Sequence, residues 1–440
     1  MRHPVDRVPR PLPLAAGAVQ HVAAMYAGVV APPLIIGAAV GLGPTDLALL
    51  ISASLFTAGV ATLLQALGFW RIGARLPLIN GVSFAVVAPV LAIVKEHGQE
   101  GALPVIYGAT LVGGALTALA APYFGRLTRL FPAVVAGTVI TLIGLCLLPV
   151  AIRWIRGGEG TSASSGSVLV AGVTLAVILA CNRFLTGVAG RFALLIGLVV
   201  GTVVAWPLGM VDTAAFSDAP VFAFATPLHF GVPVFDVAAI VSMCIVMVVV
   251  MTESTADMLA LGEIVGRPTT ERTIAEGLRA DGLATSFSAV FGGFACTAFA
   301  QNIGLVALTR VVSRYVVAGA GVFLVLLGLF PVAGAVVALV PGPVLGGAGL
   351  VLFGSVAVSG IKTLAADGLE TPGKVLTVAI ALGVGLVPIV APDFYHGFPG
   401  LVQTVMDSGI SAGTITAVVL NLLVGRRASG RAAGQGVQVG

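Results

Sequence analysis

Long apolar runs follow one another almost end to end along this chain and leave little room for other structure. Residues 168–180, 192–206 and 237–251 are three such runs. Of the 440 residues, 58% are hydrophobic and 9% are charged, whereas a soluble domain carries about 25% charged residues. Because about 20 apolar residues carry a helix across a bilayer, the sequence predicts an all-α polytopic membrane protein without a separate soluble enzyme domain.

Charged, proline-rich and glycine-rich breaks divide the apolar sequence into about fourteen segments. These start near residues 14, 47, 78, 103, 132, 167, 190, 234, 281, 300, 315, 342, 374 and 406. If the N-terminus is cytoplasmic and every segment crosses, 19 of the 22 Lys and Arg residues lie on the cytoplasmic side, and only Lys95, Arg153 and Arg156 lie outside. Because basic residues concentrate on the cytoplasmic side, this distribution predicts a multi-pass plasma-membrane protein with both termini in the cytoplasm.

The remaining composition argues against nucleic-acid, disulfide and metal chemistry. The formal charge of +4 comes from scattered basic residues, which are not interleaved with aromatic residues as in a nucleic-acid platform. Cys146, Cys181, Cys244 and Cys296 are isolated in apolar runs with no His at ligand spacing. We therefore expect packing roles for the cysteines, no metal, no cofactor and no nucleic-acid partner.

Two segments, the third and the tenth, are short and interrupted by Gly, Pro and small polar residues. They cover residues 76–89 and 294–304, and each is third in its half of the chain, which is typical of inverted repeats. Because a non-helical backbone is tolerated at membrane depth only where it is buried in protein or lines a cavity, we expect the two breaks to face each other at a substrate site. Simple close packing of helices at the glycines is the alternative.

Acidic side chains inside an apolar span are costly and therefore indicate function. In the eighth segment Glu253 and Asp257 lie four residues apart on one helical face. Two close carboxylates resist ionising together, so this pair is a candidate for proton coupling. Hydrogen bonding to neighbouring helices is the alternative role for both.

Gln20 and His21 lie about one turn inside the first apolar run. An imidazole at this depth relays a proton or orients a carboxylate. It serves equally well as a structural hydrogen-bond partner, and the sequence leaves both roles for His21 open.

The most specific local pattern runs from Gln301 to Arg310. It places the amides of Gln301 and Asn302 at a backbone break, followed by Gly304 and by Thr309-Arg310 at the cytoplasmic edge. The string resembles the signature of the nucleobase-ascorbate transporter family: Gln, Glu or Pro, then Asn-x-Gly, four variable residues, and Thr followed by Arg, Lys or Gly. The resemblance extends over nearly the whole chain and includes the 253–257 and 20–21 motifs.

This resemblance implies fourteen segments in two inverted repeats of seven, with segments three and ten each broken into a short strand and a helix. It implies a core domain, a gate domain and a homodimer formed through the gate, embedded in membrane lipid. The expected boundaries are 1–13 for an N-terminal tail, 14–131 and 233–331 for the core halves, 132–232 and 332–424 for the gate halves, and 425–440 for a C-terminal tail.

The resemblance also implies a set of substrate-binding residues. Glu253 and Gln301 would hydrogen-bond a nucleobase, while backbone amides near Phe84 and Ala300 would meet its carbonyl oxygens. Beyond these, we expect substrate contacts from Ser83 and Asn302 and supporting roles for Gln20, Thr309 and Arg310. The flat apolar face of a base requires an aromatic neighbour and a few convergent polar groups, and Phe84 suits the first requirement.

The identity of the first motif residue narrows the cargo. In the family, Gln at this position accompanies xanthine and urate, Glu accompanies uracil, and Pro accompanies ascorbate, so Gln301 favours xanthine or uric acid imported with protons. Three alternatives remain: a permease for uracil or for a broader range of nucleobases, an inorganic-anion carrier of the same architecture, and an intramembrane enzyme. An intramembrane enzyme would need a nucleophile and a base at a suitable spacing, and the sequence shows no such pair.

Overall fold

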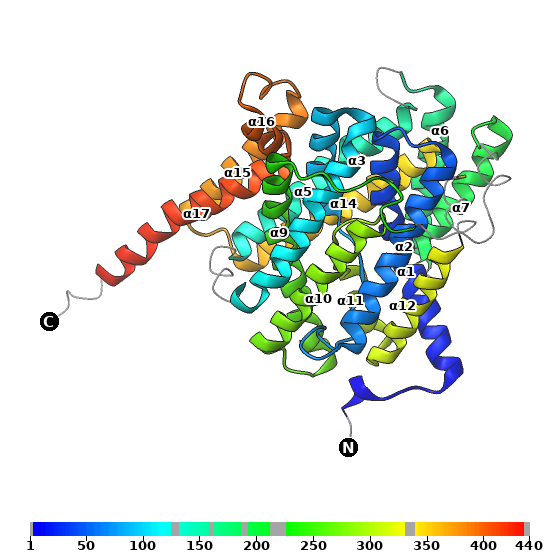
Figure 1. Ribbon diagram of the computed structural model, residues 1–440, viewed down its shortest axis with the longest axis horizontal. Helices are drawn as coiled ribbons and strands as arrows, with labels where there is room; N and C mark the ends of the chain where they lie inside the picture. The colour runs from blue at the N-terminus through cyan, green and yellow to red at the C-terminus, as the bar shows by residue number, and fades with distance from the viewer. Residues whose placement is uncertain are drawn as a thin grey trace.

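The computed structural model describes residues 3–124, 132–157, 162–185, 192–211, 226–330 and 339–434. Helices make up nearly all of the regular structure in these ranges, and two three-residue strands form one small sheet. The helices lie side by side as a bundle, with the N-terminus at one side of it (Figure 1). The chain is therefore an all-α polytopic protein, as its apolar runs predict.

The elements follow one another with short connections. The α-helices are α1 (Pro11–Ala39), α2 (Pro44–Leu67), α3 (Val87–Ala120), α5 (Ala133–Arg156), α6 (Ser165–Phe184), α7 (Ala193–Ala205), α9 (Val237–Val265), α10 (Glu271–Val290), α11 (Ala300–Thr309), α12 (Arg314–Leu329), α14 (Gly342–Asp367), α15 (Pro372–Val390), α16 (Gly400–Asp407) and α17 (Gly409–Gly434). The strands are β1 (Asn80–Val82) and β2 (Cys296–Ala298), and short 3₁₀ helices are η1 (Pro4–Asp6), η2 (Phe84–Val86), η3 (Ala121–Tyr123) and η6 (Trp206–Leu208).

Local signals explain where the helices begin and end. Proline occupies the first turn of α1, α2 and α15, where its missing N–H costs nothing. Asp236 and Thr270 cap α9 and α10 by accepting from Ala239 N and Thr273 N, which satisfies N–H groups at the helix start. Gly266 ends α9 with a φ of 70°, a conformation that glycine adopts without strain.

The observed helix starts agree with most of the predicted segment starts. Two places differ. The first is α10, which begins at Glu271 rather than near 281, because almost three turns that contain Glu271, Arg272, Glu276 and Arg279 extend the helix ahead of its apolar part. The second is α3, which runs through both the third and the fourth predicted segment, with Gly98 at φ 74° and ψ 172° marking the break between them.

Length and composition of the described helices fit a membrane protein. Within the described residues, eight helices are long and apolar enough to cross a membrane, or nine if α16 and the apolar part of α17 form one bent span. The shorter apolar helices include Arg314–Leu329 and Ala193–Leu208. The total of fourteen segments in two inverted repeats stays a prediction.

The helices pack in two groups. In one, α2 packs against α12, α1 and α10, and α3 packs against α10 and α9. In the other, α5 packs against α14, α15 and α17, and α14 packs against α6. Helix α16 lies between the groups and contacts α3 and α9. The predicted boundaries of the core and gate domains remain a proposal.

Glycine allows the closest of these contacts. A Cβ added at Gly144 of α5 would lie 2.3 Å from the backbone nitrogen of Ala357 on α14. A side chain there would collide with backbone, which cannot yield as a flexible side chain does. Small residues at helix crossings are typical of membrane bundles, where close packing drives association.

Candidate functional site

The two interrupted segments pair with each other at the centre of the candidate site, as predicted. β1 and β2 are antiparallel, with Asn80 opposite Ala298 and Val82 opposite Cys296. The pairing extends past both strands, because Ser83 N donates to the carbonyl oxygen of Ala295 at 2.8 Å and Phe299 N donates to that of Ile79 at 2.9 Å. The backbone groups of two non-helical stretches are thereby satisfied within protein, as a membrane interior requires.

A helix begins directly after each strand. η2 starts at Phe84 and leads into α3, while α11 starts at Ala300. The first N–H groups of a helix have no intrahelical acceptor and carry a partial positive charge. The paired strands therefore bring two helix N-termini to one region, an arrangement that favours the carbonyl or anionic oxygens of a ligand.

Glu253 and Asp257 lie on α9, which packs against β2 and α11. Both side chains are half-buried, and Asp257 lies close enough to interact electrostatically with both Glu253 and Asp281. Asp257 Oδ2 is buried without a hydrogen-bond partner among the described residues. The structure thus brings an acidic pair on α9 to the strand pairing and adds a third carboxylate that sequence reasoning missed.

Asp281 of α10 ties three elements together. Its carboxylate, 1% exposed as a residue, accepts from Gln65 Nε2 of α2 at 2.7 Å and from Asn80 Nδ2 of β1 at 2.5 Å. Gln65 also donates to the carbonyl oxygen of Gly277 at 2.9 Å and accepts from Ala74 N at 2.9 Å. This network fixes the position of β1. The sequence feature that could have identified Asp281 is an acidic residue within a helical segment of a membrane protein.

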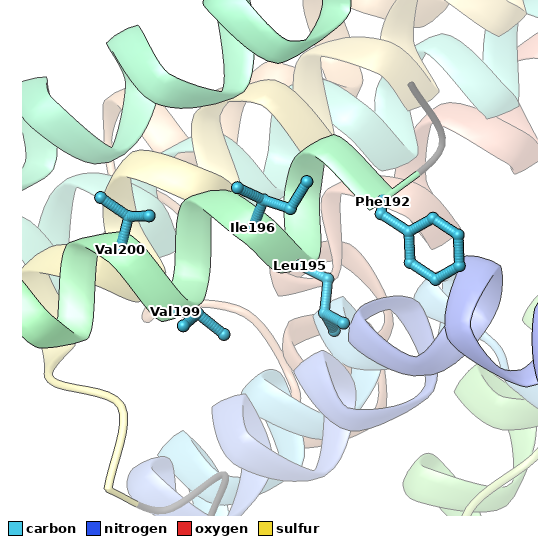
Figure 2. A pocket seen from close by; sticks show the side chains of 5 residues that line it. All are labelled: Phe192, Leu195, Ile196, Val199 and Val200. Carbon is cyan, nitrogen blue, oxygen red and sulfur yellow. The ribbon is translucent and has the colours of Figure 1, made fainter. Parts of the chain in front are cut away.

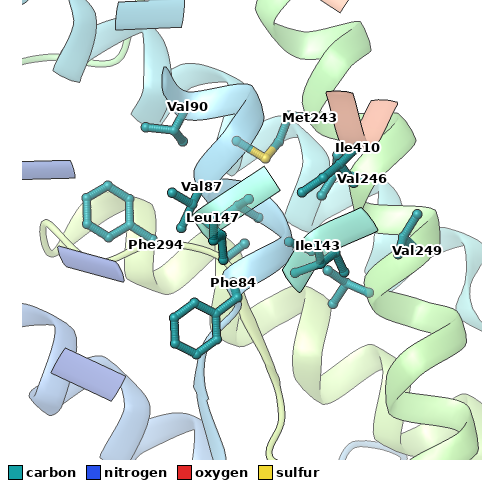
Figure 3. Close-up of a cluster of buried hydrophobic side chains, with 14 of the residues drawn as sticks. Phe84, Val87, Val90, Ile143, Leu147, Met243, Val246, Val249, Phe294 and Ile410 are labelled. Carbon is teal, nitrogen blue, oxygen red and sulfur yellow. The ribbon is translucent and has the colours of Figure 1, made fainter. Parts of the chain in front are cut away.

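Ser83 and Phe84 lie at the start of η2. Ser83 is fully buried, and its hydroxyl accepts from Ala85 N at 3.2 Å, so it caps the helix that follows. Phe84 is 9% exposed, and its ring lies edge-on to that of Phe353 on α14, with centroids 5.9 Å apart and planes at 76°. Figure 3 shows Phe84 at the edge of a buried apolar cluster with Leu147 and Ile143.

The signature motif spans α11 from end to end. The side chains of Ala300 and Gln301 lie outside the described part of the structure, so the substrate contact of Gln301 stays a prediction. Asn302 is 1% exposed, and its Nδ2 lies 3.9 Å from Met25 Sδ on α1. Thr309 donates to the carbonyl oxygen of Leu305 at 2.8 Å. Arg310 ends α11 with φ +56°, so the last two residues shape the far end of the helix.

Gln20 and His21 belong to α1, which packs against α11 and β1. His21 is 1% exposed and Gln20 is half-buried. Met25, one turn further along α1, makes the contact with Asn302. The first segment therefore lies beside the motif helix.

A separate apolar pocket lies on α7. Phe192, Leu195, Ile196, Val199 and Val200 line it, as Figure 2 shows. A ligand that has hydrogen-bonding edges needs a few polar groups to orient it, and these five side chains offer none. The polar region around the strand pairing is therefore the better candidate for a substrate site.

Sequence comparisons connect the chain to transport proteins. Residues 13–394 match the Permease family, model name Xan_ur_permease. The chain is 43% identical to the uric acid transporter UacT of Escherichia coli K12 over 95% of this chain and 87% of that protein. It is 40% identical to the uric acid permease PucJ of Bacillus subtilis, covering 93% of this chain and 92% of that protein. It is 39% identical to a xanthine permease of Bacillus subtilis, covering 92% of each.

Solved structures share the fold at low identity. The transmembrane domain of the cyanobacterial bicarbonate transporter BicA aligns with a TM-score of 0.60 and 13% identity, over 92% of this chain and 96% of that one. The murine anion transporter Slc26a9 in an inward-facing state aligns with a TM-score of 0.59 and 15% identity, over 96% and 69%. At such identities the likeness concerns the fold alone.

Proposed function

Because the chain belongs to the Permease family, the nucleobase transporter family that its signature motif indicates, we propose that it is a secondary active transporter that imports uric acid, xanthine or both. The observation that carries this proposal is the similarity over nearly the whole chain to permeases named for these two purines. Family membership makes the chain a multi-pass membrane transporter and not an enzyme.

Recognition of the base rests on the region around the strand pairing. Phe84 supplies an aromatic face, Glu253 an acceptor for a ring N–H, and Gln301 both a donor and an acceptor. The N-termini of η2 and α11, at Phe84 and Ala300, offer backbone N–H groups to the carbonyl oxygens of an oxidised purine. This division of roles matches an apolar pocket with a few convergent polar groups.

Ser83 and Asn302 support this site indirectly in the described conformation. The Ser83 hydroxyl is occupied by Ala85 N, and Asn302 Nδ2 points to Met25 on α1. We therefore assign them to positioning the starts of η2 and α11. Thr309 and Arg310 terminate α11, and Gln20 belongs to the adjacent α1.

Coupling to protons rests on the acids of α9. Glu253 and Asp257 lie one turn apart, and Asp281 adds a third acid near Asp257. When carboxyl groups lie close together, a state in which at least one of them keeps its proton is favoured over the state in which all are ionised. A base that bonds to Glu253 therefore links substrate binding to protonation of the pair. His21, buried in α1, is a candidate for relaying the proton.

The two packing groups support a proposal for alternating access. We propose that the site-bearing group, containing α1, α2, α3 and α9–α12, moves as a core against a gate of α5–α7 and α14–α17, in a homodimer with cytoplasmic termini. The paired breaks belong to one group, so their movement together preserves the site. An inorganic-anion carrier is the second candidate because BicA and Slc26a9 share this fold, although the nucleobase motif argues against it.

An uptake assay tests the assignment. Cells that express the chain are given radiolabelled urate, xanthine or uracil, with and without a protonophore, and with Na⁺ replaced by a non-transported cation. We expect saturable urate or xanthine uptake that collapses with the protonophore and is insensitive to Na⁺. Uptake of uracil alone would show that uracil, and not a purine, is the cargo. Uptake that depends on Na⁺ would show that Na⁺, and not H⁺, is the coupling ion. Bicarbonate or sulfate flux without purine uptake would support the anion carrier.

A further inference from the structure

Helix α16 reaches from one packing group across to the other. It meets the apolar part of α17 at an angle of 93°, and it packs against α3 and α9. Figure 1 shows it at the side of the bundle opposite the N-terminus. Lys95, one of three basic residues that the charge pattern predicts on the external side of the membrane, lies on α3, which α16 contacts.

Three polar contacts join α3 to α16 and to the segment that precedes α16. Lys95 Nζ donates to the carbonyl oxygen of Pro392 at 2.6 Å and forms an ion pair with Asp407 Oδ2 at 3.3 Å. Thr404 donates to the carboxylate of the next residue, Glu96. The Lys95 side chain is 39% exposed and that of Asp407 is 7% exposed. Thr404 is 1% exposed, so the contacts lie at the boundary between solvent and the packed interface.

Apolar packing continues from these contacts toward the candidate site. Val90 of α3, Met243 and Val246 of α9 and Ile410 of α17 are buried in one cluster that also contains Phe84, and Figure 3 shows these five side chains. Ser242 and Ser411 add a contact between α9 and α17, with their hydroxyl oxygens 3.4 Å apart. The described side chains therefore close this end of the boundary between the groups.

The same short stretch of helix carries the polar contacts and the candidate site. Phe84 starts η2, η2 continues into α3, and Lys95 and Glu96 lie just before the break at Gly98. Phe353 lies on α14. A movement of this stretch relative to both α14 and α16 therefore separates the polar contacts and displaces Phe84 from Phe353. One rigid piece of helix connects the outer surface to the substrate region.

We propose that Lys95 and Glu96, together with Pro392, Thr404 and Asp407, form an outer latch that holds the outer end of the crevice between the two packing groups closed and that releases when substrate enters from outside. The inference rests on the alternating access of the proposed function. An ion pair at the edge of solvent contributes little net energy, and its partners are hydrated again once they separate. The contact is therefore suited to repeated opening and closing.

Accessibility of a buried cysteine tests the latch without any substrate. The four native cysteines are replaced by alanine, and Val246→Cys places one thiol in the apolar cluster beneath the latch. Intact cells are then treated with a membrane-impermeant maleimide. We expect Lys95→Ala or Asp407→Ala to raise the labelling rate about two- to fivefold. The charge swap Lys95→Asp with Asp407→Lys should return it toward the parent rate.

His97→Ala is the matched control. It lies two residues from Lys95, and its Nδ1 is 3.3 Å from the carbonyl oxygen of Ile93 in its own helix. Its labelling rate should equal that of the parent. Equal labelling of the parent, Lys95→Ala and Asp407→Ala would overturn the latch, as would an equal rise in His97→Ala. Because the labelling experiment contains no nucleobase, its result is independent of the uptake assay. Failure of the uptake assay would overturn the proposed cargo but not the latch.

Discussion

Three acids near the strand pairing have different surroundings. Asp281 is buried, whereas Glu253 and Asp257 are half-buried. Asp281 accepts from the amides of Gln65 and Asn80 at 2.7 and 2.5 Å, so its charge is held by fixed donors. Both amides donate to Asp281 Oδ1, whereas Asp281 Oδ2 and Asp257 Oδ2 are both buried without a hydrogen-bond partner among the described residues. Glu253 lies one turn before Asp257 on α9. A carboxylate with fixed donors suits structure, whereas an acid without them is free to exchange a proton or accept from a ligand.

Asp281→Leu should destabilise the protein more than Asp281→Asn. Leucine leaves two buried amide donors unpaired, and each costs about 1–3 kcal/mol, whereas asparagine retains one acceptor oxygen. The midpoint of thermal unfolding in detergent, followed by size-exclusion chromatography, compares the two variants. Equal midpoints for Asp281→Leu and the parent would show that this network does not fasten β1.

Glu253→Gln should abolish uphill urate uptake and retain part of the binding. Glutamine preserves the shape and the acceptor oxygen of the side chain but removes its titratable group. Radiolabelled uptake with and without protonophore measures accumulation, and binding to purified protein measures recognition. Full protonophore-sensitive accumulation by this variant would exclude Glu253 from coupling.

Gln301→Glu should lower purine uptake by about 5- to 150-fold, because a mispaired buried polar group costs about 1–3 kcal/mol. The change removes an amide donor and adds a carboxylate to the motif helix. Some uracil uptake should appear in exchange. Competition of xanthine and urate against labelled urate gives the measurement, and unchanged competition would mean that this amide does not read the base.

The sequence predicts these site residues unevenly. Glu253, Asp257 and the motif from Gln301 to Arg310 stand out because each is local and placed in an apolar run. The partners of Asp281 could not be found this way, because Asn80 and Gln65 lie 201 and 216 residues away from it and nothing in their neighbouring sequence indicates the contact. Such a network exists only after the two interrupted segments have paired.

At the scale of elements, apolar periodicity predicts most helix starts, and glycine determines how closely the helices approach. The breaks of the third and tenth segments were predictable, because proline and glycine interrupt apolar runs there. The right-angle turn between α16 and α17 was not. An eight-residue helix has too few residues to show a distinct pattern, and its place depends on contacts with α3 and α9.

Gly144→Ala should weaken the packing of α5 on α14. The added Cβ would lie 2.3 Å from Ala357 N, and such overpacking costs about 1–3 kcal/mol. Gly354→Ala on α14 is the matched control, since a Cβ there meets nothing within 4 Å and alanine favours helix over glycine. The thermal midpoint should fall in the first variant and hold or rise in the second. A fall of equal size in both would contradict a steric cause.

At the scale of the whole molecule, transport depends on which helices move together. The paired strands, the acids of α9 and the motif helix α11 all belong to one packing group, whereas α5, α14 and α17 contribute apolar surface such as Phe353 and Leu147. A site assembled from two facing breaks loses its convergent groups if one break rotates against the other. Joint movement of the site-bearing group preserves them, and only its surface against the other group changes.

Two engineered disulfides separate these possibilities. Ser242→Cys with Ser411→Cys joins α9 to α17 across the groups, at a pair whose hydroxyl oxygens are 3.4 Å apart. Ser288→Cys with the native Cys296 joins α10 to β2 within the site-bearing group, where the Oγ to Sγ distance is 3.3 Å. All other native cysteines are replaced by alanine in both proteins. Each protein is assayed for urate uptake before and after oxidation, so that the reduced form is its own reference.

Oxidation of the first pair should arrest uptake, because it prevents the site-bearing group from moving past α17. Oxidation of the second pair should leave most uptake intact, because its two elements travel together. A reducing agent should restore transport in the first protein, which distinguishes a trapped state from a damaged one. The opposite result would be uptake that continues when the disulfide between positions 242 and 411 is formed and stops when the disulfide between positions 288 and 296 is formed. It would mean that transport rearranges the site-bearing group internally and does not carry it as one body.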